Sequence, residues 1–267
     1  MKEAGLKKMI SVISARSVTQ APILESSLSR LYTVQAGLYD ELYSQIFNYG
    51  HEFHRYCRWL RRYRARHILE VGCGSGRLLQ FFVKDGFQIE GLDLSAPLLD
   101  IAKTRVDIPL HHQDMRSIKL CKKFDAVLVT GRSFTYMTTN DDVLSALRSL
   151  RRLLGKGGIL LFDNFYAPLI LSGFKPRWRD ERKVGDKRFI RESRLKLNLK
   201  TGITWDWISV LSVFQKTKLI FTDRDSTTLR AFFPEEISSY LALSGFSVLR
   251  HSRKKEARDF LTIARAT

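Results

Sequence analysis

The sequence has few cysteines, no long apolar run and no internal repeat. Its three cysteines, Cys57, Cys73 and Cys121, lie far apart without the spacing of metal ligands, so neither a disulfide framework nor a zinc site is expected. No apolar segment approaches the length of a membrane-spanning helix. With 44% hydrophobic and 27% charged residues among 267, the composition is typical of a folded globular protein. We therefore expect a cytoplasmic protein without a metal or a transmembrane segment.

Acidic residues are scarce relative to basic ones. The chain has 27 Asp and Glu against 45 Lys and Arg, which gives a formal net charge of +18. This charge favours acidic partners such as nucleic acid, phosphorylated small molecules or an anionic surface. Because the cations are spread along the chain, a generally basic surface without a specific partner is an equal alternative.

The first residues, MKEAGLKKMISVISARSVTQ, are basic and contain a short, interrupted apolar stretch. That stretch is too short for a good secretory signal. We expect residues 1–30 to form an N-terminal extension that frays or closes as a lid, with an organelle-targeting presequence as the alternative.

Strand and helix patterns alternate along much of the chain. After a helical region over residues 28–63, apolar runs at HILEV, FQIEGLD, IPLHHQD, FDAVLVTG and ILLFD indicate strands separated by amphipathic helices. A further helix and two final strands follow Phe233. Repeated β-α alternation is typical of an α/β protein with a doubly wound, mainly parallel sheet.

A different pattern interrupts this alternation after Pro168. Residues 187–233 alternate apolar and polar side chains with period two, which predicts antiparallel strands. The basic stretch 175–183 is expected to be an exposed loop, although it could also bind an acidic acceptor. We therefore predict an α/β domain over residues 31–166 and 232–267 and an antiparallel β insert over residues 167–231, which covers the acceptor site.

The turn after the first strand, VGCGSG, contains Gly72, Gly74 and Gly76. Glycine lets the backbone approach a ligand where a Cβ would clash. The turn is not a dinucleotide fingerprint, because the third glycine of G-x-G-x-x-G would fall at Arg77. It is not a P-loop either, since no Gly-Lys-Ser/Thr follows. The turn alone leaves the ligand open.

Two carboxylates at the ends of the following strands narrow the choice of ligand. Asp93 comes 17 residues after Gly76, close to the spacing of roughly 20 at which a carboxylate binds ribose hydroxyls. Capping of the next helix is the alternative role for Asp93. Asp114 ends the third strand, where it could accept a hydrogen bond from an adenine amino group beside the Met115 backbone. Ligands bind beyond the carboxyl ends of such strands, so both residues indicate an adenosine-type ligand.

The stretches LEVGCGSG, GLDLS, QDMRS, FDAVLVTGRSFTYM and LLGKGGILLFDNF resemble class I S-adenosylmethionine-dependent methyltransferases. The resemblance implies a Rossmann-like, seven-stranded fold that binds S-adenosyl-L-methionine (SAM) and releases S-adenosyl-L-homocysteine (SAH). It implies that the three glycines approach the methionine part, that Asp93 holds the ribose, and that Thr130 and Gly131 face the sulfonium. The expected cofactor-binding residues are Tyr43, Gly72, Gly74, Gly76, Asp93, Leu94, Asp114, Met115, Thr130 and Gly131.

The acceptor side is less constrained by the resemblance. GRSFTYM and LYDELY are similar to stretches of glycine N-methyltransferases and of nucleotide-sugar N,N-dimethyltransferases, but Arg132 replaces an Asn and Tyr136 a His. The identity of the methyl acceptor therefore cannot be inferred from the similarity to either group. Tyr39 and Tyr136 are the catalytic candidates, since a tyrosine hydroxyl can orient an acceptor. Core packing is the alternative for Tyr39, which lies four residues from Tyr43 on a predicted helix.

The sequence thus predicts a SAM-dependent methyltransferase (EC 2.1.1.-) that methylates a small molecule by in-line displacement, with nitrogen as the expected acceptor atom. The acceptor could be acidic or phosphorylated, and the enzyme a monomer or a homodimer. An RNA methyltransferase is an alternative that the sequence disfavours, because VTGRS lacks the Asn/Asp-Pro-Pro-aromatic turn of many base-amine methyltransferases. A SAM-binding protein without catalysis is the other alternative.

Overall fold

The alternating segments form a central sheet. The computed structural model describes residues 28–267, and within them seven strands follow the order β3-β2-β1-β4-β5-β11-β10. Only β11 runs against its neighbours, because it pairs antiparallel with both β5 and β10. The strands are β1 (His67–Val71), β2 (Gln88–Asp93), β3 (Leu110–His112), β4 (Phe124–Val129), β5 (Leu154–Tyr166), β10 (Phe246–Ser252) and β11 (Asp259–Ala266). The predicted doubly wound, mainly parallel sheet is confirmed.

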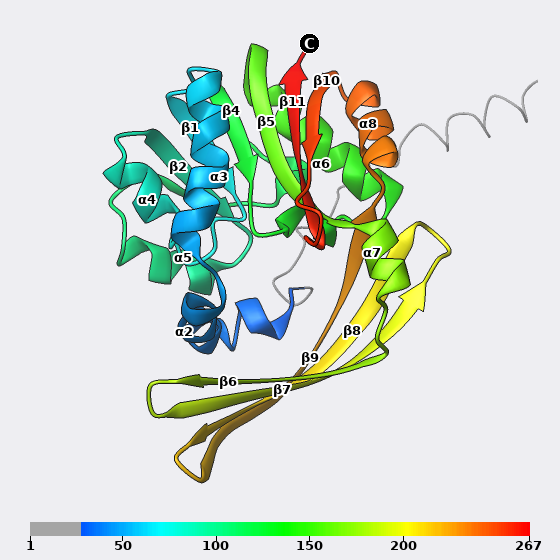
Figure 1. Cartoon of the computed structure of the whole chain (residues 1–267). Helices are drawn as coiled ribbons and strands as arrows, with labels where there is room; N and C mark the ends of the chain where they lie inside the picture. Colours follow the sequence, from blue (N-terminus) through cyan, green and yellow to red (C-terminus); the bar gives the residue numbers. More distant parts are fainter. Residues whose placement is uncertain (1–27) are drawn as a thin grey trace, which may run out of the picture.

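Helices cover both faces of this sheet (Figure 1). One buried cluster joins the sheet to α3, α4 and α5, and another joins its opposite face to α6 and α8. The helices are α3 (Tyr49–Arg62), α4 (Leu79–Lys84), α5 (Ala96–Lys103), α6 (Asn140–Arg152) and α8 (Pro234–Leu243). Ser95 caps α5 by accepting a hydrogen bond from the Leu98 N–H. Ser95, and not Asp93, is therefore the N-cap residue of α5.

The helical region predicted over residues 28–63 is divided into three pieces. A short 3-10 helix, η2 (Arg30–Tyr32), precedes α2 (Ala36–Ile46), and α3 begins at Tyr49. The Asn48 side chain accepts from the His51 N–H at 2.9 Å, which caps α3 and separates it from α2. Gly50 therefore lies in the first turn of α3.

Four long antiparallel strands continue the same sheet beyond β5 and form a segment here called the insert, which lies below the α/β body (Figure 1). They are β6 (Arg177–Val184), β7 (Lys187–Asn198), β8 (Ile203–Gln215) and β9 (Lys218–Phe232), and the short α7 (Ala167–Ser172) leads into them. The end of β9 pairs in parallel with β5, at Phe165–Ala231 and Tyr166–Phe232. Arg230, also in β9, donates to Glu236 of α8 at 2.6 Å. The insert is thus fixed to the body at this end.

The expectation of an exposed loop over residues 175–183 is wrong, since Arg177–Val184 forms the edge strand β6. Its charged side chains are largely exposed on both faces, so the sequence shows no apolar alternation. Charged residues are typical of edge strands, where they discourage pairing with other chains.

Most of the predicted N-terminal extension, residues 1–27, lies outside the described residues. The described part begins against the insert, where the Arg30 guanidinium donates to Asp223 at 2.7 Å. No helix within residues 28–267 is long and apolar enough to cross a membrane.

Candidate functional site

A cavity of about 700 Å³ opens at the carboxyl ends of the parallel strands. Its walls come from the ends of β1, β2 and β4, from the segment after β3, from η2 and α2, and from β8 and β9 of the insert. The predicted site residues in its walls are Tyr39, Gly72, Gly74, Asp93, Leu94, Asp114, Met115, Gly131 and Tyr136. The other three predicted residues, Tyr43, Gly76 and Thr130, do not line it.

The glycine turn lies at the base of this cavity and has an unusual backbone. Gly72, Gly74 and Gly76 all have positive φ, between 54° and 77°. A Cβ at Gly74 would meet only Leu98, at 4.0 Å, so the space beside this residue is open to a ligand. A Cβ at Gly76 would lie 3.0 Å from the Ala102 side chain instead. Gly76 therefore allows the turn to pack against α5, whereas Gly74 borders the cavity.

Asp93 is held rigidly at the cavity wall by backbone groups. Its two carboxylate oxygens accept from the Gly74 N–H at 2.7 Å and the Ser95 N–H at 2.8 Å. Burial raises the pKa of Asp93, and these hydrogen bonds oppose that rise. A carboxylate has about four acceptor sites, so Asp93 can still accept from two hydroxyl groups of a ligand.

Asp114 is engaged by a residue that sequence reasoning missed. Arg116 donates to it from its backbone N–H at 2.8 Å and from its guanidinium Nη2 at 2.7 Å. Arg116 also lines the cavity and pairs with Asp142 at 2.7 Å. Asp114 thus has less acceptor capacity left for a ligand than Asp93 has.

A group of tyrosines lies between the body and the insert. The hydroxyls of Tyr32 and Tyr136 are 2.6 Å apart, and the Tyr39 ring is 5.2 Å from that of Tyr32. Burial raises the pKa of all three phenols, so they are neutral at neutral pH. Tyr43 packs 4.2 Å from Tyr39 but accepts a hydrogen bond from Arg191 of the insert. Tyr32 was not predicted, because its contact with Tyr136 spans 104 residues.

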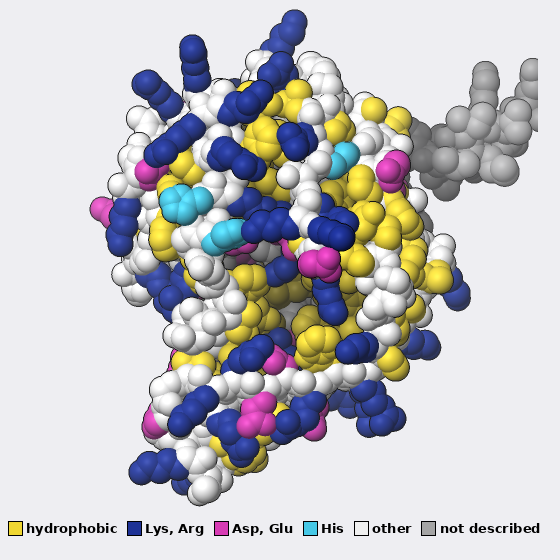
Figure 2. Space-filling view, viewed as in Figure 1, with side chains coloured by type: hydrophobic (Ala, Val, Ile, Leu, Met, Phe, Trp, Pro, Cys, Tyr) yellow, Lys and Arg dark blue, Asp and Glu magenta, His cyan; other side chains and the backbone are white. Residues whose placement is uncertain are grey.

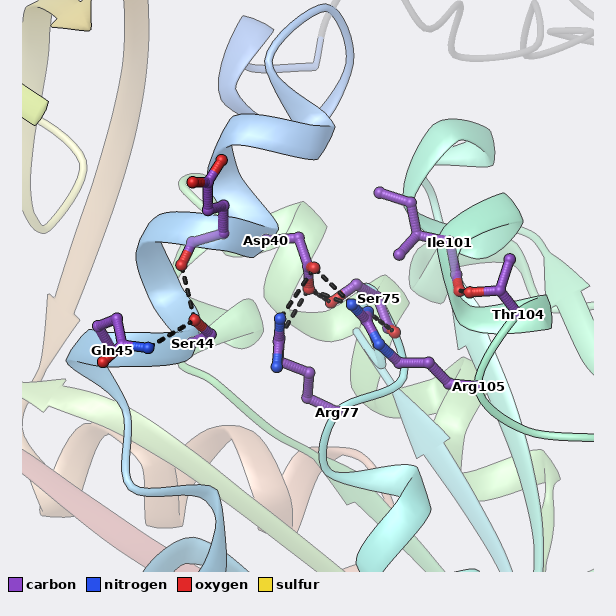
Figure 3. Close-up of polar contacts among 9 residues, drawn as sticks. Asp40, Ser44, Gln45, Ser75, Arg77, Ile101, Thr104 and Arg105 are labelled. Atoms are coloured by element: carbon purple, nitrogen blue, oxygen red, sulfur yellow. Dashed lines mark hydrogen bonds and ion pairs between the residues drawn. The ribbon is translucent and has the colours of Figure 1, made fainter. Parts of the chain in front are cut away.

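An ion-pair network fastens α2 over the glycine turn (Figure 3). Asp40 of α2 accepts from Ser75 Oγ at 2.5 Å, Arg77 Nε at 2.7 Å and Arg105 Nη1 at 2.9 Å. Burial acts to raise the pKa of Asp40, but the two guanidinium groups hold it below its usual range. The network fixes α2, and with it Tyr39, relative to the turn. No motif in the sequence pointed to it.

A buried acid lies next to the cavity wall. Glu70, just before Val71, accepts from Thr130 Oγ1 at 2.7 Å, while its Oε2 has no partner among the described residues. Burial raises the pKa of Glu70 to about 8. Thr130 therefore contacts this acid rather than the cavity.

The residues present fit the expected cofactor. Asp93 provides acceptors for hydroxyl groups, Leu94 and Met115 provide apolar walls, and the space beside Gly74 is open. Among residues 28–267 no cluster of three metal-ligating side chains occurs.

Residues 68–158 match a family model described as a methyltransferase domain. A putative methyltransferase of Bacillus subtilis, YqeM, is 33% identical over 140 residues, which cover 50% of this chain and 55% of that protein. A dTDP-3-amino-3,4,6-trideoxy-alpha-D-glucopyranose N,N-dimethyltransferase of Streptomyces venezuelae is 34% identical over 105 residues, 39% of this chain and 44% of that one. The matches thus span about half the length of these relatives.

The similarity to solved structures covers more of the chain than the sequence similarity to these relatives does. Streptomyces venezuelae DesVI superposes with a TM-score of 0.76 at 24% identity, over 87% of this chain and 98% of that one. CalS10, an amino pentose methyltransferase from Micromonospora echinaspora, gives 0.73 at 22% identity, over 88% and 97%. The chain therefore shares the Rossmann-like fold of these methyltransferase structures, and its residues 68–158 match the methyltransferase domain model.

Proposed function

We propose that the protein transfers a methyl group from SAM to a nitrogen atom of a small-molecule acceptor. The observation that carries the proposal is one cavity with two kinds of wall. Asp93 and the glycine turn form the cofactor side, and the tyrosines with β8 and β9 form the other. The matches to sugar N,N-dimethyltransferases and to a glycine/sarcosine N-methyltransferase support nitrogen as the acceptor atom.

On this proposal, residues of the α/β body hold the cofactor. Asp93 accepts from the ribose hydroxyls, Leu94 and Met115 pack against the adenine, and the methionine part lies along Gly72 and Gly74. Bound SAM supplies a methyl group that is already activated by its sulfonium. Gly76, Thr130 and Tyr43 then act indirectly, through contacts with Ala102, Glu70 and Arg191 respectively.

The acceptor side must orient a lone pair toward the methyl group and exclude water. The neutral hydroxyls of Tyr32 and Tyr136 can donate to, or accept from, an acceptor amine. Asp206 of β8 lines the same cavity, and its Oδ1 accepts from Thr228 at 2.8 Å. Asp206 is our candidate to receive the proton that an amine must lose before or during transfer. The insert over residues 167–231 accordingly covers the acceptor, and residues 31–166 with 232–267 form the methyltransferase domain.

SAH binding tests the cofactor assignment. We expect SAH to raise the thermal midpoint of the wild-type chain, and Asp93→Ala to weaken SAH binding at least tenfold, because the ribose acceptor is lost. Asp100→Ala, an exposed acid on α5, is the matched control and should bind SAH like the wild type. Equal SAH affinity in Asp93→Ala and the wild type would remove the ribose assignment.

Transfer of a labelled methyl group tests the acceptor class. A panel of small amines, amino-sugar nucleotides and tRNA should show label on a small amine. Label on tRNA in preference to every small amine would overturn the proposal. SAH binding without transfer to any acceptor would favour the non-catalytic alternative.

We further propose a cytoplasmic location, since Cys57, Cys73 and Cys121 are all unpaired.

A further inference from the structure

The end of α3 and the turn that follows it are strongly basic. Residues 53–66 contain six arginines and no acidic residue. Arg58, Arg61 and Arg62 are exposed near the carboxyl end of the helix, where cations suit the negative end of the helix dipole. Of these three, only Arg61 forms an ion pair within the described residues 28–267, with Asp85 at 2.7 Å. The helix dipole therefore accounts for a basic helix end.

Two arginines from the last strands of the chain join this helix end. The guanidinium of Arg250 in β10 lies 6.0 Å from the centre of the Trp59 ring, and that of Arg265 in β11 lies 5.5 Å from the centre of Tyr63. The two rings stack with their centres 6.4 Å apart, and Arg58 lies 5.3 Å from Trp59 as well. Because Arg250 and Arg265 belong to strands, the helix dipole does not explain their position.

Four exposed arginines thus form one surface, here called the arginine patch, which consists of Arg58, Arg62, Arg250 and Arg265. None of the four forms an ion pair with any part of the chain that the structure describes. Figure 2 shows Lys and Arg side chains gathered over the upper part of α3 and the neighbouring strands. Arg58 and Arg250 share one ring, so their charges repel each other. An anionic partner would remove this repulsion, which makes the patch a candidate interaction surface.

The arginine patch lies away from the cavity. Arg62 ends α3 just before β1 begins at His67, and Arg265 pairs with Ile159, which stands beside Ala126 near the start of β4. These arginines therefore lie toward the amino ends of the parallel strands, whereas the cavity opens at their carboxyl ends. A molecule bound at the patch is remote from the site of the proposed methyl transfer, and the inference that follows does not depend on that proposal.

We propose that the arginine patch binds the phosphate backbone of a nucleic acid. A guanidinium offers paired N–H donors that match phosphate oxygens, and a nucleic acid presents a continuous row of phosphates to cations along a helix and an adjacent strand. Contacts to phosphates carry no sequence information, so binding is independent of base sequence. An anionic membrane suits the patch less, because the apolar side of α3, with Phe53 and Leu60, is buried against the sheet and is not free to enter lipid.

Fluorescence anisotropy of a short labelled single-stranded RNA, titrated with the full chain at several salt concentrations, tests the patch. The patch variant carries Arg58→Gln, Arg62→Gln and Arg250→Gln. The control variant loses the same charge from exposed positions of the insert, through Arg177→Gln, Arg194→Gln and Arg224→Gln. We expect the patch variant to raise the dissociation constant about tenfold or more, and to reduce the slope of log affinity against log salt by about 2. The control variant should bind RNA like the wild type.

Further measurements separate this surface from other roles of the same arginines. The thermal midpoint of the patch variant should not fall, because the substitutions relieve repulsion, and its SAH affinity should equal that of the wild type. No RNA binding by the wild type, or equal losses in the patch and control variants, would overturn the proposal. A lower midpoint with unchanged RNA binding would do the same, and so would preferential binding of polyglutamate or of phosphatidylserine vesicles. Should the patch variant fail to fold, Arg250→Gln alone decides.

Discussion

Protonation of the buried residue Glu70 is coupled to the folding stability of the chain. The carboxyl group is 1% exposed, and burial raises its pKa from the ordinary 4.5 to about 8. The folded chain thus binds this proton more tightly than the unfolded chain does. Stability that depends on the proton is complete below about pH 4.5 and is lost as the pH rises to about 8.

Glu70→Gln should remove this pH dependence. The free energy of unfolding of the wild type should carry a downward contribution of up to roughly 1 kcal/mol per pH unit between pH 5 and 8, which the variant lacks. Urea unfolding at several pH values measures the difference between the two slopes. Glu235→Gln, at an exposed position of α8, should keep the wild-type slope. Parallel slopes for wild type and Glu70→Gln would show that the residue is not buried in its protonated form.

At the scale of elements, the glycine turn depends on close contact as well as on backbone shape. A Cβ at Gly72 would lie 2.1 Å from Ser133 Oγ, far inside van der Waals contact. Gly86, at the end of α4, has a similar φ of 82° but nothing within 4 Å of such a Cβ. Alanine substitutions at the two glycines therefore separate the free-energy cost of the positive φ from the free-energy cost of the steric clash.

Gly72→Ala should consequently destabilise the chain more than Gly86→Ala. We expect about 1–2 kcal/mol for Gly86→Ala, from the positive φ alone. Gly72→Ala should exceed that value, and adding Ser133→Gly should recover the excess. Unfolding in urea measures all four free energies, and equal losses at the two glycines would refute the steric argument.

Predictability also differs between elements. The strand, turn and helix over residues 67–103 could be predicted because apolar period, glycine position and helix cap are local signals. The same signals brought Gly74 and Asp93 to one cavity wall. Strand β6 could not be predicted, since polar side chains on both faces leave no period to detect. The same holds for the break between α2 and α3, which depends on the Asn48 cap.

Across the whole molecule, the site joins segments far apart in the chain, and this limited prediction of the acceptor side. Tyr32 meets Tyr136, and Arg191 meets Tyr43 across 148 residues. No short motif encodes such contacts. Tyr43 was predicted to bind the cofactor, and the structure places it against the insert. Asp206 and Arg191 belong to the insert, and no short sequence pattern encodes its position against the body.

The Asp40 network links the position of α2 to ligand binding, because it joins α2 to the glycine turn that borders the cavity. Asp40→Asn leaves Arg77 and Arg105 without their shared acid, so we expect a loss of about 2 kcal/mol in unfolding free energy and weaker SAH binding. Asp100→Asn breaks an exposed pair with Lys103 and should change stability by less than about 0.5 kcal/mol. Denaturation and SAH titration of both variants provide the comparison. A similar small effect in both would mean that the other contacts of α2 hold it in place without the Asp40 network.

The insert is attached to the body in two ways that differ in strength. Near β5 it is attached by backbone pairing and by buried Arg230, whereas near α2 it is held by side chains alone, including the Lys187–Glu41 pair at 2.7 Å and apolar contacts of Leu42. Separating the contacts at α2 breaks no backbone hydrogen bond of the sheet. We infer that any opening of the insert would separate these side-chain contacts and those of η2 with Asp223 and Asp225, and would pivot at the end of β9, where the backbone pairs with β5.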